Sequence, residues 1–255
     1  MGVLDRFSLQ GRTALVTGAG RGIGYALAQA LAEAGADVAC VDIDGDSARR
    51  AAEELARQGV RTLGLQADVT RKDEVIAAVS TVVNAWGRLD IGVNNAGIAR
   101  GGKAEDLSEE AWDAVLEVNL KAVFLCCQAE AHVMLPQGYG KIINTASMSA
   151  TIVNRPQCQA NYNAAKAGVV QLTRSCAAEW ASRGVRVNCI SPGHTVTPMT
   201  ANMGDDVRAI WLSNTPMGRL GDPSDLQGAV VYLASEASDY VTGHDLIIDG
   251  GYVLW

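Results

Sequence analysis

The fold is decided by the stretch Arg12-Thr13-Ala14-Leu15-Val16-Thr17-Gly18-Ala19-Gly20-Arg21-Gly22-Ile23-Gly24. Its first six residues predict a strand, and the Ala-rich run after Gly24 predicts a helix. Glycines at such a junction let the backbone turn tightly and approach a pyrophosphate, whose charge the helix N-terminus attracts. We therefore interpret the turn as a nucleotide-binding loop rather than as a merely tight turn. The expected contacts come from Gly18, Arg21, Gly22, Ile23 and Gly24.

The same alternation of strand and helix continues along the rest of the chain. Short β-branched runs lie near residues 12–17, 37–42, 61–66, 89–94, 140–145, 185–190 and 244–248. Ala-rich helical segments lie near residues 22–34, 45–58, 71–86, 108–135, 160–182 and 223–236. This pattern is typical of repeated βαβ units. We predict one α/β domain over residues 1–255, a doubly wound Rossmann domain whose seven-stranded, mainly parallel sheet carries helices on both faces.

One long segment, from Ser191 to Asp222, follows neither pattern. Its prolines and glycines are Pro192, Gly193, Pro198, Gly204, Pro216, Gly218 and Gly221. A connection of this length inside a compact domain is usually functional. We expect residues near 193–220 to form a lid over a substrate.

Composition excludes several classes of function. The chain has 255 residues, a net charge of −7 and a pI near 5.0, so we expect neither nucleic acid nor a membrane as a partner. The N-terminus resembles no signal peptide, and no apolar stretch reaches the roughly 18 residues of a membrane span. The six cysteines lack C-x-x-C spacing and the three histidines lie far apart. We therefore expect a cytoplasmic protein with reduced cysteines and no protein-bound metal.

Asp42 indicates which nicotinamide dinucleotide would bind. It ends the second predicted strand, where a carboxylate accepts hydrogen bonds from the adenosine ribose hydroxyls and repels a 2′-phosphate. Arg21 is the opposing signal, because a guanidinium binds such a phosphate. We give Asp42 more weight and predict NAD, with Ile43 beside it. The alternative role for Asp42 is a helix N-cap, which Asp44 could supply as well.

The next two predicted strands also end in candidate cofactor residues. Asp68 could accept a hydrogen bond from the adenine amino group, and Val69 could cover the ring. Asn94-Asn95-Ala96-Gly97 ends the fourth strand at the same edge, where ligands of doubly wound sheets lie. Asn95, Ala96 and Gly97 would let the cofactor pass close to the backbone, while Asn94 is better explained by structural hydrogen bonding.

Tyr162 and Lys166 form a candidate acid and base. Their spacing of four residues places a phenol and an ammonium on one face of a helix, one turn apart. A fixed cation favours the phenolate, so we expect Lys166 to lower the pKa of Tyr162 from its usual value of about 10. Taken alone, the pair would more often be an exposed surface pair, because such pairs are common on helices, and the rest of the chain decides against this alternative.

With these motifs, the chain resembles the short-chain dehydrogenase/reductase family across essentially its whole length. The resemblance is carried by Thr17-Gly18-x-x-x-Gly22-Ile23-Gly24, Asn94-Asn95-Ala96-Gly97, Asn119, Ser147, Tyr162-x-x-x-Lys166 and Pro192-Gly193. It implies four catalytic side chains, which are Asn119, Ser147, Tyr162 and Lys166. Tyr162 and Lys166 would also contact the cofactor, as would Pro192, Gly193, Thr195 and Thr197 near the nicotinamide.

The resemblance also implies how these side chains act on a secondary alcohol. Tyr162 would take or give the hydroxyl proton while hydride moves between the carbinol carbon and NAD. Lys166 would hold the nicotinamide ribose and lower the pKa of the phenol. Ser147 would hydrogen-bond the substrate oxygen. Asn119 would bind a water that links Lys166 to solvent.

Within the family, the chain looks most like polyol dehydrogenases of the galactitol and sorbitol type. That likeness is carried by residues 147–157, Thr215-Pro216-Met217-Gly218-Arg219 and the ending from Asp249 to Trp255. Tyr162 follows Ser147 by fifteen residues, a longer interval than in many members, which predicts an insertion over the substrate. The expected substrate contacts are Ser147, Ser149, Asn154, Gln157, Tyr162 and His194.

These observations predict an NAD-dependent oxidoreductase that interconverts a polyol and the corresponding ketose. One alternative is a reductase that acts on a ketose or a 3-oxoacyl thioester with NADPH. A different class is a nucleotide-sensing protein without catalysis, against which the complete catalytic set argues. The apolar helices near 108–135 and 160–182 and the tail from Tyr252 to Trp255 are expected to form the interfaces of a homotetramer.

Overall fold

The computed structural model describes residues 2–198, 200–201 and 203–255. In this part of the chain, seven strands form one sheet. They are β1 (Thr13–Thr17), β2 (Asp37–Asp42), β3 (Thr62–Gln66), β4 (Ile91–Asn94), β5 (Gly140–Thr145), β6 (Val185–Pro192) and β7 (Asp245–Ile248). The strand order is β3-β2-β1-β4-β5-β6-β7, and every neighbouring pair is parallel. The predicted doubly wound α/β fold is confirmed.

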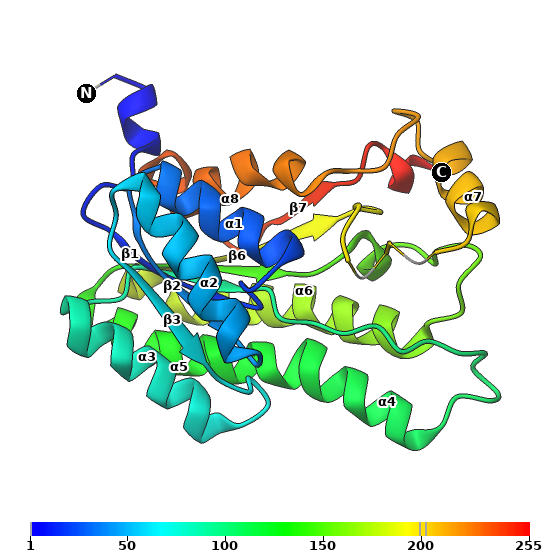
Figure 1. Cartoon of the computed structure of the whole chain (residues 1–255), viewed down its shortest axis with the longest axis horizontal. Helices are drawn as coiled ribbons and strands as arrows, with labels where there is room; N and C mark the ends of the chain where they lie inside the picture. Colours follow the sequence, from blue (N-terminus) through cyan, green and yellow to red (C-terminus); the bar gives the residue numbers. More distant parts are fainter. Residues whose placement is uncertain (1, 199, 202) are drawn as a thin grey trace.

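Helices cover both faces of this sheet, as Figure 1 shows. They are α1 (Gly22–Glu33), α2 (Gly45–Leu55), α3 (Lys72–Trp86), α4 (Glu109–Leu116), α5 (Ala122–Gln137), α6 (Ala160–Trp180), α7 (Asp205–Asn214) and α8 (Gln227–Ala234). One apolar cluster joins α1, α2 and α8 to the sheet, and a second joins α3, α5 and α6. The central strands β1, β4 and β5 are buried along their whole length because helices pack on both sides.

Short helical turns complete the backbone. The 3₁₀ turns are η1 (Leu4–Phe7), η2 (Ala56–Gln58), η4 (Met148–Ala150), η5 (Ala181–Arg183), η6 (Pro223–Leu226), η7 (Glu236–Ser238) and η8 (Tyr252–Leu254). The turn η3 (Glu117–Lys121) is π-helical and lies between α4 and α5. The predicted helix near 108–135 is therefore interrupted at Asn119. Such π turns often occur at functional sites.

The segment from Ser191 to Asp222 was predicted to be irregular, and that prediction is wrong for its middle part, which is α7. Asp205 and Asp206 lie in the first turn of α7, where the helix dipole favours negative charge. Trp211 of α7 is only 2% exposed, so tertiary packing supplies much of the stability of this short helix. Met199 and Asn202 of the expected lid lie outside the described residues.

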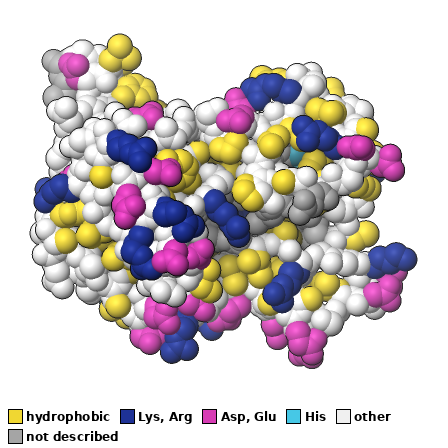
Figure 2. Space-filling model, in the orientation of Figure 1, with side chains coloured by type: hydrophobic (Ala, Val, Ile, Leu, Met, Phe, Trp, Pro, Cys, Tyr) yellow, Lys and Arg dark blue, Asp and Glu magenta, His cyan; other side chains and the backbone are white. Residues whose placement is uncertain are grey.

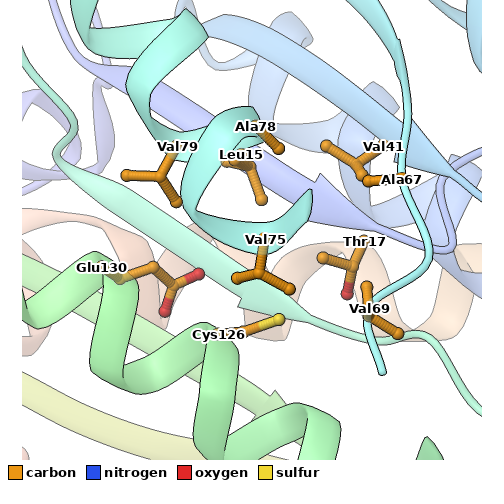
Figure 3. A pocket seen from close by; sticks show the side chains of 10 residues that line it. All are labelled: Leu15, Thr17, Val41, Ala67, Val69, Val75, Ala78, Val79, Cys126 and Glu130. Atoms are coloured by element: carbon orange, nitrogen blue, oxygen red, sulfur yellow. The ribbon is translucent and has the colours of Figure 1, made fainter. Parts of the chain in front are cut away.

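The carboxyl group of Glu130 lies in the core against β4. Glu130 of α5 is completely buried, and its Oε2 accepts a hydrogen bond of 3.1 Å from Asn94 Nδ2, whereas Oε1 has no partner among the described residues. Figure 3 shows Glu130 and Cys126 at a cavity of about 10 Å³ whose other lining is mainly aliphatic. Burial raises the pKa of Glu130 to about 8, so the neutral acid is favoured at neutral pH.

Candidate active site

The glycine loop between β1 and α1 has the geometry of a phosphate-binding turn. Gly18 and Gly22 have φ values of 64° and 60°, a region that favours glycine. A Cβ atom on Gly24 would overlap the Gly18 carbonyl, and one on Gly20 would lie 2.7 Å from Ser47 Cβ. Because side chains are excluded at these positions, the backbone and the N-terminus of α1 remain accessible to a pyrophosphate. Arg21 is exposed and Ile23 is half-buried beside this loop.

Hydrogen bonds join the glycine loop to the turn after β4. The Thr17 hydroxyl accepts from the backbone N–H groups of Asn95 and Ala96 at 3.0 and 3.2 Å. Asn95 Nδ2 donates to the Thr17 carbonyl at 3.2 Å, and the Thr145 hydroxyl donates to Asn95 Oδ1 at 3.4 Å. The ends of β1, β4 and β5 are thus held together at the sheet edge where nucleotides bind.

Asp42 lies directly against the glycine loop. Its Oδ2 accepts from the backbone N–H of Gly20, and its Oδ1 accepts from that of Asp44, both at 3.0 Å. The predicted alternative role of Asp42 as a helix cap belongs to Asp44, whose side chain accepts from Asp46 and Ser47 at the start of α2. Asp42 is therefore a fixed carboxylate at the end of β2, and Ile43 after it is 66% exposed.

Asp68 and Val69 lie at the same sheet edge, after β3. Asp68 Oδ1 accepts from the backbone N–H and the hydroxyl of Thr70 at 2.9 and 2.7 Å. These bonds fix the carboxyl group in a turn. Val69 is half-buried. Both residues are placed where the adenine contacts were predicted, and the contacts themselves stay a prediction.

The beginning of the predicted lid approaches the glycine loop. A Cβ atom on Gly22 would lie 3.8 Å from Thr197 Cβ and 3.7 Å from Pro198 Cδ. Thr195 is buried and pairs with Gly221, and the Thr200 hydroxyl donates to the Thr195 carbonyl at 2.8 Å. The described part of the segment after β6 thus lies beside the glycine loop. Pro192 is buried, and a Cβ on Gly193 would lie 2.6 Å from Asp249 Cα.

Tyr162 and Lys166 lie on the same face of α6, beside the end of β5. Lys166 Nζ donates a 2.6 Å hydrogen bond to the Thr145 carbonyl and lies 5.7 Å from the centre of the Tyr162 ring. Burial lowers the pKa of Lys166 to about 8. Burial also raises the pKa of Tyr162, an effect that an interaction with Ser147 opposes. The prediction that Lys166 lowers the phenol pKa is wrong, because desolvation disfavours both charged forms and raises that pKa.

Asn119 is completely buried in the π turn η3. Its Oδ1 accepts from the backbone N–H of Ile98 and its Nδ2 donates to the Ile98 carbonyl, both at 2.8 Å. The side chain therefore cross-links η3 to the segment after β4. A Cβ atom on Gly97 would lie 3.1 Å from Asn119 Oδ1, so Gly97 leaves room for this cross-link. The water expected at Asn119 stays a prediction.

Ser147 begins the segment that faces Tyr162 from the end of β5. Its Oγ lies 3.1 Å from Ser149 Oγ, and Ser149 Oγ donates to Asn154 Oδ1 at 2.8 Å. Gln159 Nε2 donates to Ser149 Oγ at 3.3 Å and to Asn163 Oδ1 at 3.0 Å. Ser149 and Asn154, which were predicted to bind substrate, bond to one another.

His194 and Gln157, the other two expected substrate contacts, meet at Trp211 of α7. The His194 ring stacks on the Trp211 ring at 3.8 Å and 9°, and it meets the Tyr252 ring edge-on at 5.0 Å. Trp211 Nε1 donates to Gln157 Oε1 at 3.1 Å. Burial lowers the pKa of His194 to about 4, and its buried Nε2 has no hydrogen-bond partner among the residues that the structure describes. Burial therefore favours the neutral imidazole.

This geometry agrees with what known proteins show. A family model described as "Enoyl-(Acyl carrier protein) reductase" matches residues 18–253. The chain belongs to the short-chain dehydrogenase/reductase family. Together with the relatives below, this match makes the protein an NAD(P)-dependent oxidoreductase of the alcohol dehydrogenase class.

Individual members of the short-chain dehydrogenase/reductase family are similar over nearly the whole chain. A probable NADP-dependent mannitol dehydrogenase of Yarrowia lipolytica is 43% identical, over 98% of this chain and 90% of that protein. A galactitol 2-dehydrogenase (L-tagatose-forming) of Cereibacter sphaeroides is also 43% identical, over 98% of each chain. The crystal structure of a gluconate 5-dehydrogenase from Burkholderia cenocepacia J2315 with NADP and tartrate has a TM-score of 0.95 and 38% identity, with 100% coverage of each chain.

The short-chain dehydrogenase/reductase site contains residues that we did not predict. Asn161 is completely buried, and its Nδ2 donates to the carbonyls of Arg100 and Ala111 at 2.9 and 3.1 Å. It fixes the first turn of α6, which carries Tyr162. The sequence could have indicated this role, because Asn161 directly precedes Tyr162 and a polar side chain must find hydrogen-bond partners if it is buried. Trp211, Gln159 and Asn163 had no such local signal.

Among residues 2–198, 200–201 and 203–255, no three His, Cys, Asp or Glu side chains lie together as a metal site would require. None of the helices described is long and apolar enough to span a bilayer. Acidic and basic side chains are interspersed on the face drawn in Figure 2.

Proposed function

We propose that the protein is an NAD-linked dehydrogenase that interconverts a secondary alcohol of a polyol or sugar alcohol and the corresponding ketose. One observation supports the proposal above all. Tyr162, Lys166 and Ser147 lie at the end of β5, on the same edge of the sheet as the glycine loop. Two similar enzymes are named for polyols, mannitol and galactitol. The short polar side chains of Ser149, Asn154 and Gln157 suit a substrate with several hydroxyl groups.

The catalytic residues would divide the reaction as follows. The dinucleotide, when bound, supplies or accepts the hydride. Tyr162 Oη gives the proton to the ketone oxygen during reduction and takes it back during oxidation. Lys166 supplies positive charge beside the phenol, and Ser147 orients the substrate oxygen. Because burial raises the pKa of Tyr162, alcohol oxidation is expected to accelerate and ketone reduction to slow as pH rises through that pKa.

A nicotinamide dinucleotide fits the residues present. Gly20 and Gly24 lie where any side chain would collide with neighbouring atoms, so the loop is shaped for close approach of a phosphate. We assign NAD from Asp42, whose two oxygens are held by the backbone N–H groups of Gly20 and Asp44. A carboxylate fixed in this way cannot swing aside for a 2′-phosphate. The exposed Arg21 beside it is the group that would favour NADP.

The cofactor assignment is tested by a pair of neighbouring acids. Asp42→Ala should change the ratio of kcat/KM for NAD and NADP by about tenfold or more toward NADP, since it removes one close charge repulsion. Asp44→Ala removes a carboxylate two residues away that caps α2, and it should leave the ratio unchanged. A wild-type enzyme that prefers NADP would overturn the assignment.

The substrate class is tested by initial rates over a panel. Polyols with NAD and ketoses with NADH are expected to turn over, and Tyr162→Phe serves as the control for contaminating activity. The second candidate is a 3-oxoacyl thioester, because a 3-oxoacyl-[acyl-carrier-protein] reductase of Staphylococcus aureus is 43% identical over 95% of this chain. Activity on 3-oxoacyl thioesters with NADPH, and none on polyols, would favour that candidate. Tight NADH binding without any turnover would favour a nucleotide sensor.

The proposed assembly is a homotetramer in the cytoplasm. Trp112 of α4 and Phe124 of α5 are 40% and 43% exposed, and Leu254 and Trp255 are 73% and 75% exposed. Large apolar side chains in contact with water mark surfaces that associate. Light scattering coupled to size exclusion should give four times the 26.7 kDa chain mass. A monomer at micromolar concentration would exclude this assembly.

A further inference from the structure

Tyr162, the proposed acid and base, lies in the first turn of α6, and the first turn is a weak part of any helix. The first four N–H groups of a helix have no partner within it, and helix ends fray. Gln159 precedes α6, and its side chain donates to Ser149 Oγ and Asn163 Oδ1 instead of capping the helix. The position of Tyr162 therefore depends on other contacts of this turn.

Asn161 supplies such contacts through one buried amide. Its side chain is completely buried, and its Oδ1 accepts a hydrogen bond from the backbone N–H of Tyr162 at 2.8 Å. Its Nδ2 donates to the Arg100 carbonyl at 2.9 Å and to the Ala111 carbonyl of α4 at 3.1 Å. One side chain thus joins the first turn of α6 to two segments that lie far from it in the sequence.

The segment after β4 packs tightly against the residues that precede α6. A Cβ atom on Gly101 would overlap the Cys158 carbonyl oxygen. Gly102 forms a parallel β-bridge with Gln159. Glycine at position 101 therefore permits the close approach of two backbones, since any side chain there would push the segments apart. This close approach keeps the segment after β4 within reach of Asn161.

We propose that Asn161 is a positioning residue for Tyr162, which holds the phenol at the substrate oxygen by fixing the first turn of α6 against α4 and the segment after β4. The inference rests on the proposed function, in which Tyr162 transfers the proton. Lys166 has its own support one turn later, because its Nζ donates to the Thr145 carbonyl at 2.6 Å. Loss of Asn161 should therefore displace Tyr162 relative to Lys166. A displacement of roughly 1 Å at a reacting group can cost about 100-fold in rate.

Two buried asparagines that bond to backbone groups provide a matched comparison of rates. Asn188 is 1% exposed, its Nδ2 donates to the Val241 carbonyl and its Oδ1 accepts from the His244 N–H, both at 3.0 Å. Asn161→Ala should lower kcat by about 10- to 100-fold and leave the dissociation constant of the dinucleotide within about twofold. Asn188→Ala should also lower the denaturation midpoint but keep kcat within about twofold of the wild type. Equal values of kcat in the two variants would overturn the inference.

Hydrogen–deuterium exchange measures the order of this turn without any substrate. The Tyr162 N–H is bonded to Asn161 Oδ1, so residues 160–164 should exchange about five- to tenfold faster in Asn161→Ala, the effect of one lost hydrogen bond. Asn188→Ala should leave this peptide unchanged and accelerate exchange at His244 instead. Unchanged exchange of residues 160–164 in Asn161→Ala would overturn the inference. Failure of every polyol to react would refute the proposed substrate class alone.

Two neighbouring glycines test the same contact from the other side and keep Asn161 intact. Gly101→Ala should reproduce the lower kcat and the faster exchange, because its Cβ would overlap the Cys158 carbonyl oxygen. Gly102→Ala is the matched control, since its Cβ would lie 3.4 Å from Leu107 Cδ1, an ordinary contact. If Asn161→Ala does not fold, this pair decides the question. Equal rates and equal exchange in the two glycine variants would contradict the proposal.

A double-variant cycle shows whether Asn161 acts through Tyr162. In the Tyr162→Phe background, Asn161→Ala should cause no further loss of kcat, because the group that it positions is already gone. The rates are measured with whichever alcohol and ketone the wild type converts. A further loss as large as that in the wild-type background would assign Asn161 a merely structural role and overturn the inference.

Discussion

The cofactor half and the substrate half of the active site are held by different kinds of hydrogen bond. On the cofactor side, the glycine loop and the turn after β4 are held by backbone groups and by the Thr17 hydroxyl. On the substrate side, Ser149, Asn154, Gln157 and Trp211 hold one another through side chains. We infer from this difference that the dinucleotide binds where glycines leave the backbone uncovered. The choice of substrate depends instead on which side chains line the other half.

Removing the acid tests this comparison with the largest expected effect. Tyr162→Phe should lower kcat by about 10²- to 10⁴-fold, the usual contribution of a general acid or base. The dissociation constant of NADH should change little, because the glycine loop is untouched. Stopped-flow kinetics and fluorescence titration measure the two quantities. Retained turnover would refute the role of Tyr162, and an equal loss of NADH binding would show that the two halves are not separable.

Adding one methyl group at Gly24 should weaken binding of the dinucleotide on the cofactor side. Gly24→Ala places a Cβ atom against the Gly18 carbonyl, so the loop must shift. We expect the dissociation constant of the dinucleotide, measured by calorimetry, to rise by about 10- to 100-fold. Gly228→Ala in α8 is the matched control, because its Cβ would meet open space and Ala favours a helix. Equal affinities in the two variants would contradict the role given to Gly24.

On the substrate side, the bond between Trp211 and Gln157 should act on KM. Trp211→Phe keeps a ring for His194 to stack on but removes the donor to Gln157. Loss of one hydrogen bond predicts that KM for the alcohol rises about fivefold, with NADH affinity unchanged. Gln157→Ala should have a similar effect, and the double variant should be no worse than either single variant. Strictly additive effects would show that the two side chains act independently.

The smallest expected effect on catalysis comes from changing Glu130, which lies in the core beside Asn94 at the end of β4. Its pKa is about 8 in the folded protein and near 4.5 in an unfolded chain, so folding takes up a proton between these values. Stability is therefore expected to fall as pH rises from about 4.5 to 8. Glu130→Gln should remove this slope in denaturant titrations, with kcat within about twofold of the wild type. Glu117→Gln, which removes a carboxylate from the exposed Glu117–Lys121 pair, should leave the pH dependence of stability unchanged. If the stability of the wild type did not fall over this pH range, Glu130 could not be the buried neutral acid described above.

The fold was predictable because its signals are local. A strand, a glycine turn and a helix are encoded within residues 12–34, and the same alternation placed each of the seven strands within about two residues. The helix α7 was missed because its stability depends on burying Trp211, which no local pattern shows. Asn119 was named from the family resemblance, but its hydrogen-bond partner, Ile98, lies 21 positions away and could not be predicted.

The sequence by itself determined that Tyr162 and Lys166 share a helical face and that glycines line the dinucleotide turn, because both depend only on spacing and backbone freedom. Only the tertiary structure decided the protonation and partners of these groups. Burial raises the pKa of Tyr162 against the expected influence of Lys166, and hydrogen bonds from distant segments commit Ser147, Ser149 and Asn154 to one another. Desolvation and hydrogen-bond direction depend on everything packed around a group, which only the folded chain brings together.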